Sequence, residues 1–331
     1  MQRMPLAQLY IRKVLNAMKD QFDREITYLR VSITDKCNLR CRYCMPEGVC
    51  VKRHENVLSF EEITEIVTAA ANLGVRKVRV TGGEPLVRRG CTELCRMIAA
   101  VPGVEEVDLT TNGTLLSGCA LAMKDAGVRR VNISLDTMDP EKYAYITGGG
   151  RLEDVLAGIE AAFDAGLTPV KVNTVLIGGF NDGEIRRLVD WTRQVPVELR
   201  FIELMPMGGR FGKSAYLPGS EVLRQVPALR ELEHDGGVAR LYRLPDGLGR
   251  VGLISPLSRH FCGACNRLRL TCEGAVKPCL HASDEILVRG KHGEELMDAL
   301  RQAIYQKPRM HGALDADHQS QAGRSMNTIG G

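Results

Sequence analysis

The sequence has few aromatic residues and no long apolar run. Phenylalanine, tryptophan and tyrosine make up 5% of its 331 residues, with a single tryptophan. Proteins that bind single-stranded nucleic acid stack bases on aromatic side chains, so this composition argues against assigning the chain to that class. No stretch approaches the ~20 apolar residues of a membrane span, and the first residues lack the apolar core of a signal peptide. We therefore expect a cytoplasmic protein that binds neither membranes nor nucleic acid.

A strong excess of one charge is also lacking. The 44 basic and 40 acidic residues leave a net charge of +4, which does not argue for nucleic acid. The G-x4-G-K-[ST] motif of phosphate-hydrolysing P-loop proteins does not occur. The seven histidines are scattered without metal-ligand spacing, and we expect each at the surface or in the core.

Cysteine, by contrast, is abundant. Six of the eleven cysteines form two closely spaced groups, and in a reducing cytosol such groups favour metal over disulfides. The first group, Cys37, Cys41 and Cys44, follows the strand-like run 28–33. Iron–sulfur cubanes normally take four thiolates, so three cysteines leave one iron free for a ligand that is not protein. Zinc is the alternative, but zinc motifs pair C-x2-C with a second, distant pair.

The second group is Cys262, Cys265 and Cys279, spaced C-x2-C-x13-C. Cys272 keeps a zinc alternative open here, because four thiolates would complete a zinc shell. The alternation of residues 267–272 argues against zinc. In a strand, Cys272 faces the core with Leu268 and Leu270, whereas Arg267 and Arg269 face the other way.

Strand-like and helix-like runs alternate between residues 28 and 203. Six βα units in succession predict a parallel sheet with helices outside and a site at the C-terminal ends of the strands. The fold class is therefore α/β, a partial (β/α)6 TIM-like barrel. Helices 59–73 and 181–193 each open with a capping-box pattern, Ser59 with Glu62 and Asn181 with Glu184. The expected strands are 28–33, 76–80, 106–110, 130–135, 169–176 and 198–203.

The pattern changes near residue 208, where two glycines interrupt the chain and short antiparallel-looking runs follow (238–244 and 250–254). The polar, glycine-rich tail has a composition that predicts disorder. We divide the chain into an N-terminal helical extension over 1–26, the partial barrel over 27–207, a smaller C-terminal cluster-binding module over 208–311, and a flexible tail over 312–331.

Basic residues occupy several of the expected strands. Lys77 and Arg79 share one face of their strand, as do Arg267 and Arg269. One such pair often marks a solvated edge, but parallel strands usually run apolar. A set spread over several strands therefore calls for an anionic partner such as a triphosphate. The set comprises Arg30, Lys77, Arg79, Lys171, Arg200, Arg267 and Arg269.

The first cysteine group, with Tyr43 before its last cysteine, resembles the signature of radical S-adenosylmethionine (SAM) enzymes. Together with Thr81-Gly82-Gly83-Glu84-Pro85, the second cysteine group and the terminal Gly330-Gly331, it is similar to the GTP 3′,8-cyclase family, the molybdenum cofactor biosynthesis protein A family. The resemblance runs from about Gln21 to the end of the chain. It implies a barrel of the radical SAM type and two [4Fe-4S] clusters, one held by Cys37, Cys41 and Cys44 and one by Cys262, Cys265 and Cys279.

The resemblance also implies an activity: conversion of GTP to 3′,8-cyclo-7,8-dihydro-GTP, the first step of molybdenum cofactor biosynthesis. A 5′-deoxyadenosyl radical derived from SAM would remove the 3′ hydrogen of GTP. The implied SAM contacts are Tyr43, Gly83, Ser134 and Met205. The implied GTP contacts are Arg30, Lys77, Arg79, Thr110, Lys171, Arg200, Arg267, Leu268 and Arg269. The implied catalytic residues are Arg267, Arg269 and the pair Gly330 and Gly331, which would reach into the active site.

The implied partners are GTP, an external one-electron donor and a downstream cyclic pyranopterin monophosphate synthase, with the protein a monomer or a homodimer. One alternative is another two-cluster radical SAM protein, such as a peptide-modifying maturase, although these usually carry more C-terminal cysteines. The other is a zinc-stabilised nucleic-acid-binding module, which metal analysis would separate from an iron protein.

Overall fold

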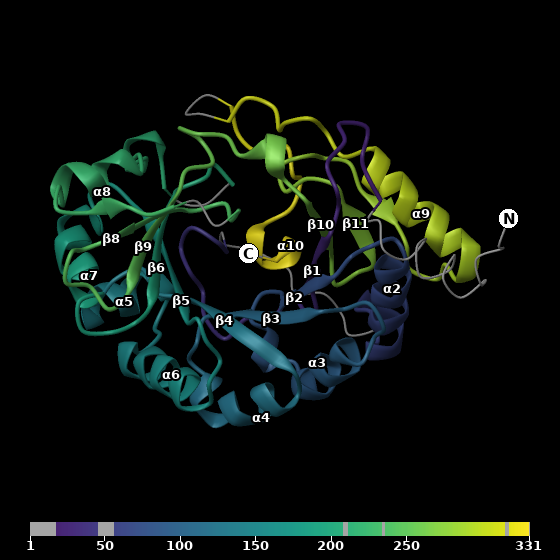
Figure 1. Ribbon diagram of the computed structural model, residues 1–331, viewed down its shortest axis with the longest axis horizontal. Helices are drawn as coiled ribbons and strands as arrows, with labels where there is room; N and C mark the ends of the chain where they lie inside the picture. Colours follow the sequence, from purple (N-terminus) through teal and green to yellow (C-terminus); the bar gives the residue numbers. More distant parts are fainter. Residues whose placement is uncertain (1–17, 46–55, 208–210, 234–235, 315–317, 331) are drawn as a thin grey trace, which may run out of the picture.

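The computed structural model describes residues 18–45, 56–207, 211–233, 236–314 and 318–330, and its centre is a twelve-stranded sheet that curves around an interior, with helices on the outside (Figure 1). Six parallel strands follow one another in chain order, and the sheet does not close. The predicted partial barrel is confirmed. Its strands are β1 (Tyr28–Ser32), β2 (Lys77–Thr81), β3 (Glu106–Thr111), β4 (Val128–Ser134), β5 (Lys171–Leu176) and β6 (Glu198–Glu203).

Helices connect these strands across the outer face. The first, α2 (Phe60–Asn72), has the predicted capping box: Ser59 Oγ accepts from the amide of Glu62 at 3.1 Å, and the amide of Ser59 donates to Glu62 Oε2 at 2.6 Å. Its buried stripe includes Ile63 and Val67. None of the helices in the described ranges combines the length and apolarity that crossing a bilayer requires. The other outer helices are α3 (Cys91–Ala99), α4 (Ala120–Asp125), α5 (Pro140–Thr147), α6 (Leu152–Asp164), α7 (Ile185–Trp191), α8 (Ser220–Gln225) and α9 (Gly293–Tyr305), whereas α10 (Met326–Ile329) lies inside the curve of the sheet.

The second predicted capping box is wrong. The Asn181 side chain does not cap a helix: its Oδ1 accepts from the amide of Ile177 at 2.9 Å, and Nδ2 donates to the carbonyls of Asp136, after β4, and Val175, in β5. The Glu184 carboxylate accepts from Thr137 Oγ1 and Lys142 Nζ. Both side chains serve tertiary contacts, so a short 3-10 turn precedes α7, which begins only at Ile185.

The segment 208–311, predicted to be a separate module, extends the same sheet at both ends. At one end β10 (Arg267–Leu270) pairs parallel with β1, followed by antiparallel β11 (Ala275–Lys277) and β12 (Ile286–Leu287). At the other end β9 (Arg250–Ile254) pairs parallel with β6, followed by β8 (Arg240–Arg243) and β7 (Arg230–Glu231). The predicted boundary at residue 208 lies outside the described residues.

The two ends of the described chain differ from expectation. The predicted N-terminal helix falls mostly on residues 1–17, which lie outside the described ranges, and residues 18–26 form a turn closed by a β-bridge between Lys19 and Glu25 instead of a helix. The disorder expected for the tail is wrong for residues 318–330. There α10 lies inside the curve of the sheet (Figure 1), and Asn327, Thr328 and Ile329 are buried.

Side chains alternate along the central strands. Leu29, Val78 and Val80 belong to the core that the helices cover. Arg30 and Arg79 alternate with these core residues and therefore face the other side of the sheet. In the sheet register, Arg30 on β1 stands opposite Arg79 on β2, and Arg79 stands opposite Asp108 on β3. The interior of the curved sheet is thus lined by polar and charged groups, unlike the apolar interior of an ordinary parallel sheet.

Candidate active site

The loop after β1 carries the first cysteine group. It lies along the end of α5, where the amide of Arg40 donates to the carbonyl of Thr147 at 2.7 Å and that of Arg42 to Ile146 at 3.0 Å. A tight turn follows, in which the amide of Cys44 donates to the carbonyl of Cys41 at 3.0 Å. These backbone bonds fix the loop at the C-terminal edge of the sheet.

The thiols of this group are free and mutually close. Cys37 Sγ accepts from the amide of Leu39 at 3.4 Å and from Asn112 Nδ2 at 3.8 Å. Burial, and then neighbouring Cys37 and Asp136, raise the pKa of Cys44 to about 12. Such thiols stay protonated by themselves, whereas a bound metal deprotonates them.

The donor set fits an iron–sulfur cluster. Three free thiols on one short loop are ligands of the kind that a cubane takes, and they leave one iron without a protein ligand. A cubane binds each thiolate at a different iron, and N–H···S bonds such as those to Cys37 are typical of its surroundings. Cys37, Cys41 and Cys44 therefore fit a three-cysteine [4Fe-4S] cluster.

The glycines after β2 pack against this loop. A Cβ atom at Gly83 would lie 2.4 Å from the carbonyl oxygen of Lys36, and one at Gly82 would lie 2.5 Å from that of Thr34. The amide of Gly83 donates to Thr34 at 2.7 Å. The close backbone approach that these glycines permit is to the cysteine loop, which any side chain would displace.

A buried glutamate next to these glycines escaped the sequence analysis as a site residue. The Glu84 carboxylate accepts from the amides of Asn112 (2.6 Å) and Leu86 (3.0 Å) and from Thr111 Oγ1 (2.8 Å). Burial nevertheless raises its pKa to about 7. Because Asn112 also reaches Cys37, Glu84 connects the loops after β2 and β3 to the cysteine loop.

The predicted SAM contacts lie along the same edge. Gly83, Ser134 and Met205 stand at or just after the ends of β2, β4 and β6. The hydroxyl of Tyr43 hydrogen-bonds to Asp136, whose pKa burial raises to about 6. Asp136 was not predicted; its position two residues after β4 is the signal that would have found it.

The second cysteine group lies at the opposite end of the β1–β10 pair. Cys262 and Cys265 come just before β10, and Cys279 comes just after its antiparallel neighbour β11. Burial, and then nearby Cys279 and Cys265, raise the pKa of Cys262. Cys272 follows the far end of β10, is buried with Leu268 and Leu270, and has Asp35 and Glu273 as charged neighbours.

Two buried cations hold this second group, and neither was predicted. Arg24 Nη1 donates to the carbonyl of Cys262 at 2.7 Å while its Nε binds Asp20 at 2.6 Å. Lys307 Nζ donates to the carbonyls of Arg267 (2.8 Å) and Pro278 (2.7 Å). Their carbonyl partners lie far apart in sequence, so no local pattern reveals them.

Three of the histidines gather beside this group, contrary to the expectation that they are scattered. Nδ1 of His260 lies 3.2 Å from Nε2 of His311, and the rings of His311 and His281 lie 5.1 Å apart. Only the fold brings them together, because they come from three separate loops.

The predicted cations of the interior divide into two sets. In the first, each protein carboxylate is shared by two cations: Lys77 and Arg79 bind Asp108 at 2.8 and 2.6 Å, and Lys171 and Arg200 share Glu198. Burial lowers the pKa of Lys171 to about 8. These two carboxylates, which the sequence analysis did not name, offset part of the charge of the four cations.

The second set lies on β1 and β10. Arg30 stands opposite Arg269, and Arg269 donates to the carbonyl of Gly330. Burial, and then the neighbouring charge of Arg267, lower the pKa of Arg269 to about 10. Leu268 faces the covered core instead, so only its backbone can meet a ligand in the interior. Gly331 lies outside the described residues.

Several buried polar atoms in the interior lack a hydrogen-bond partner among the described residues. They are Thr110 Oγ1, Asn132 Oδ1 and Asn173 Oδ1, on three neighbouring strands, and Arg267 Nε and Tyr28 Oη on the other side. Buried polar groups are normally paired, so these atoms indicate a space for a polar ligand. Of these, the sequence analysis named only Thr110 and Arg267.

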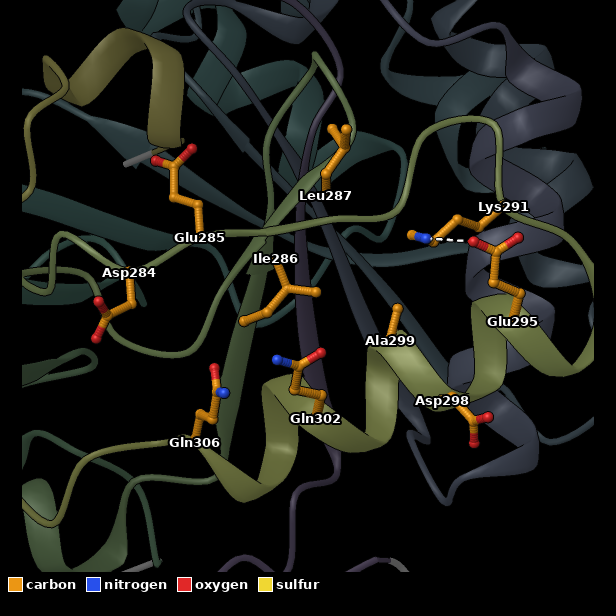
Figure 2. A pocket seen from close by; sticks show the side chains of 10 residues that line it. All are labelled: Asp284, Glu285, Ile286, Leu287, Lys291, Glu295, Asp298, Ala299, Gln302 and Gln306. Carbon is orange, nitrogen blue, oxygen red and sulfur yellow. Dashed lines mark hydrogen bonds and ion pairs between the residues drawn. The ribbon is translucent and has the colours of Figure 1, made fainter.

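These features form a site with two ends. β1 has five residues and spans ~16 Å, with one cysteine group beyond each end of the β1–β10 pair and the arginines between. A pocket between β12 and α9 shares no residue with this arrangement (Figure 2); its lining includes Glu285, Leu287, Lys291 and Gln302.

Comparisons with known proteins identify the family of the chain. The Radical SAM superfamily model matches residues 31–192, and the Molybdenum Cofactor Synthesis C model matches residues 197–313. The chain is 49% identical to the GTP 3′,8-cyclase of Alkaliphilus oremlandii over 95% of this chain and 100% of that one. It is 40% identical to the enzyme of the same name from Clostridium botulinum, again over 95% and 100%.

A solved structure shows the same fold. SuiB of Streptococcus suis bound to S-adenosylmethionine aligns over 91% of this chain and 69% of that one, with a TM-score of 0.61 at 14% identity. With the identity, coverage and family models taken together, the chain belongs to the GTP 3′,8-cyclase family of radical SAM proteins.

Proposed function

We propose that this protein converts GTP to 3′,8-cyclo-7,8-dihydro-GTP, the first step of molybdenum cofactor biosynthesis. The observation that carries the proposal is the placement of two three-cysteine groups at opposite ends of one strand pair, with Arg30, Arg267 and Arg269 in the interior between them. A nucleotide held there lies between two clusters.

The cofactors of this proposal are two [4Fe-4S] clusters and SAM. Cys37, Cys41 and Cys44 hold the first cluster, and the other cysteine group, Cys262, Cys265 and Cys279, holds the second. SAM bound at the first cluster supplies the 5′-deoxyadenosyl radical that removes the 3′ hydrogen of GTP once an external donor provides one electron. Tyr43, Gly83, Ser134 and Met205 form the SAM site, at the edge where the strands end.

The residues of the chain bind and orient GTP. Arg30, Arg267 and Arg269 offer guanidinium groups that pair with phosphate oxygens. Thr110, Asn132 and Asn173 offer the unpartnered atoms of the interior to the polar edges of the nucleoside. The two carboxylates of Asp108 and Glu198 offset only part of the charge of the four cations on the opposite wall, which therefore stays positive toward the phosphates. The four cations are Lys77, Arg79, Lys171 and Arg200.

The C-terminus completes the site. Gly330 sits against Thr81 with a φ of +83°, a conformation that favours glycine, and its carbonyl accepts from Arg269. Gly330 and Gly331, with Arg267 and Arg269, are the proposed catalytic residues. The product passes to a cyclic pyranopterin monophosphate synthase.

An anaerobic assay tests the proposal. The protein is reconstituted with iron and sulfide and given SAM and a strong reductant, and 5′-deoxyadenosine is quantified with GTP, with other nucleotides and with no substrate. We expect release that rises specifically with GTP together with a cyclised guanine product. Release of 5′-deoxyadenosine that does not depend on GTP would support the radical SAM chemistry and exclude GTP as the substrate. No release of 5′-deoxyadenosine would overturn both parts of the proposal.

A further inference from the structure

The end of the chain reaches the interior along a defined path. The amide of Ser320 donates to the carbonyl of Pro206, in the segment after β6, at 3.0 Å. Further on, Asn327 Nδ2 donates to the carbonyl of Asp35 in the cysteine loop at 3.1 Å. The path ends at Gly330, whose carbonyl accepts a hydrogen bond from Arg269 and whose Cα packs against Thr81. The four residues of α10 cannot maintain this course by themselves, because so short a helix is not stable alone.

Arg324 makes the charged contacts along this path. Its Nε and Nη2 atoms donate to the two oxygens of Glu285 at 2.6 and 2.7 Å, and Nη1 binds Glu273. Lys277 Nζ joins the group: it lies 3.1 Å from Glu285 Oε1 and 3.3 Å from the carbonyl of Ala322 in the tail. A two-point guanidinium–carboxylate contact fixes orientation as well as distance.

Arg324, Glu273 and Glu285 together form a clamp whose carboxylates lie close to β10, the strand that carries the proposed catalytic arginines, and to the strands paired with it. Glu273 lies in the turn between β10 and β11, and Glu285 lies just before β12. All three charged side chains are 22–23% exposed, so water screens the pairs less than it screens a surface contact. The clamp therefore sets where the chain end lies relative to β10.

We propose that Arg324 is a positioning residue, whose clamp on Glu273 and Glu285 keeps Gly330 on Arg269. The kinetic part of this inference rests on the proposed function; the structural part does not. Loss of the clamp lets the last residues of the chain leave the interior while the barrel core stays folded. The chain end then spends less time on Arg269.

The test uses the full, cluster-loaded protein with Arg324→Ala, Arg324→Lys and Glu273→Gln. Arg301→Ala is the matched control, since Arg301 also binds two carboxylates, Glu294 and Asp298, but on the exposed face of α9. Hydrogen exchange of residues 318–331 is measured by mass spectrometry. The second readout is cyclised product formed per 5′-deoxyadenosine released, and iron content and GTP binding are recorded for each variant.

For Arg324→Ala we expect exchange in the tail to rise, and product per 5′-deoxyadenosine to fall, by about tenfold each, the effect of losing a charge-assisted hydrogen bond. GTP binding and iron content stay as in the wild type. Arg324→Lys keeps the positive charge but loses the two-point guanidinium contact, so both of its readouts should lie between those of the wild type and of Arg324→Ala. Glu273→Gln keeps Arg324 and its contact with Glu285, so it should also give intermediate values. Arg301→Ala changes nothing.

Unchanged tail exchange in Arg324→Ala and Glu273→Gln would overturn the clamp whatever the activity. Faster exchange with an unchanged product ratio would overturn its positioning role. If the wild type forms no cyclised product, the proposed function fails, while the exchange experiment still decides the clamp.

Discussion

Arg24 donates a hydrogen bond to the backbone carbonyl of Cys262 at 2.7 Å, although 238 residues separate them. The same guanidinium donates to the carbonyl of Pro308 at 2.7 Å and is held by Asp20. One buried side chain thus ties the start of the described chain to the loop that carries the second cysteine group and to the segment after α9.

Replacing this arginine will release the second cluster selectively. In Arg24→Ala the buried carboxylate of Asp20 loses its partner, so the free energy of unfolding falls by about 3–5 kcal/mol. We expect iron content to drop from about eight to about four atoms per chain, because the first cysteine loop does not contact Arg24. Iron analysis checks this. Arg193→Ala, which breaks only exposed ion pairs, serves as control; full iron content in Arg24→Ala would contradict the anchoring role.

The unpartnered hydroxyl of Thr110 distinguishes ligand binding from stability. Thr110→Val removes a buried polar atom without a partner in the described residues, so thermal stability without GTP should hold or rise. The KM for GTP should rise by about tenfold, because a hydrogen bond to substrate is lost.

The matched control is Thr174→Val. Thr174 Oγ1 donates to the carbonyl of Leu135 at 2.6 Å, so the free energy of unfolding should fall by about 1 kcal/mol with no change in KM. An identical response of the two variants in both measurements would remove Thr110 from the site.

Glu84 predicts a pH dependence. Burial raises its folded pKa to about 7 from an ordinary 4.5, so in this window the folded chain holds a proton that the unfolded chain releases. Its contribution to stability is therefore complete below pH 4.5 and is lost as pH rises toward 7.

Urea unfolding of the wild type and of Glu84→Gln at about pH 5 and about pH 8 measures this effect. The difference in unfolding free energy, wild type minus variant, should decrease at the higher pH. A difference independent of pH would mean that Glu84 keeps an ordinary pKa.

The contact between Gly330 and Thr81 predicts that a substitution at Thr81 partly reverses the effect of a substitution at Gly330. A Cβ atom there would lie 2.5 Å from Cγ2 of Thr81, so Gly330→Ala should displace the chain end and reduce product formation without loss of iron. Adding Thr81→Ser removes that methyl group and should restore part of the activity; the strained φ of an alanine limits the recovery. Product analysis of the single and double variants decides, and no recovery would place the cause elsewhere.

Cys272 decides the ligand count of the second cluster. Cys272→Ala should keep about eight iron atoms per chain and lose about 1 kcal/mol of stability as a small buried side chain is truncated. Cys279→Ala should keep about four iron atoms per chain, because it loses a ligand of the second cluster. Loss of a whole cluster in Cys272→Ala would make it a ligand.

The sequence by itself determined the barrel and the cysteine groups, because both depend on short-range patterns. Apolar runs separated by amphipathic helices predict βα units, and cysteines a few residues apart predict a shared metal wherever the loop lies. The same local reasoning failed at Asn181, because its side chain has tertiary partners that local spacing does not reveal.

Only the tertiary structure decided which carboxylates meet the interior cations and how the ends of the chain are held. Asp108 binds Lys77 and Arg79 of the neighbouring strand, and Glu198 binds Lys171 of its neighbour; these pairings depend on register and not on distance along the chain. Arg24 binds carbonyls 238 to 285 residues away along the chain, and Arg324 binds the carboxylates of Glu273 and Glu285 in the β10–β12 region. The tail looked disordered because composition reflects average solvation, whereas its order comes from a few hydrogen bonds and ion pairs to residues made neighbours by the fold.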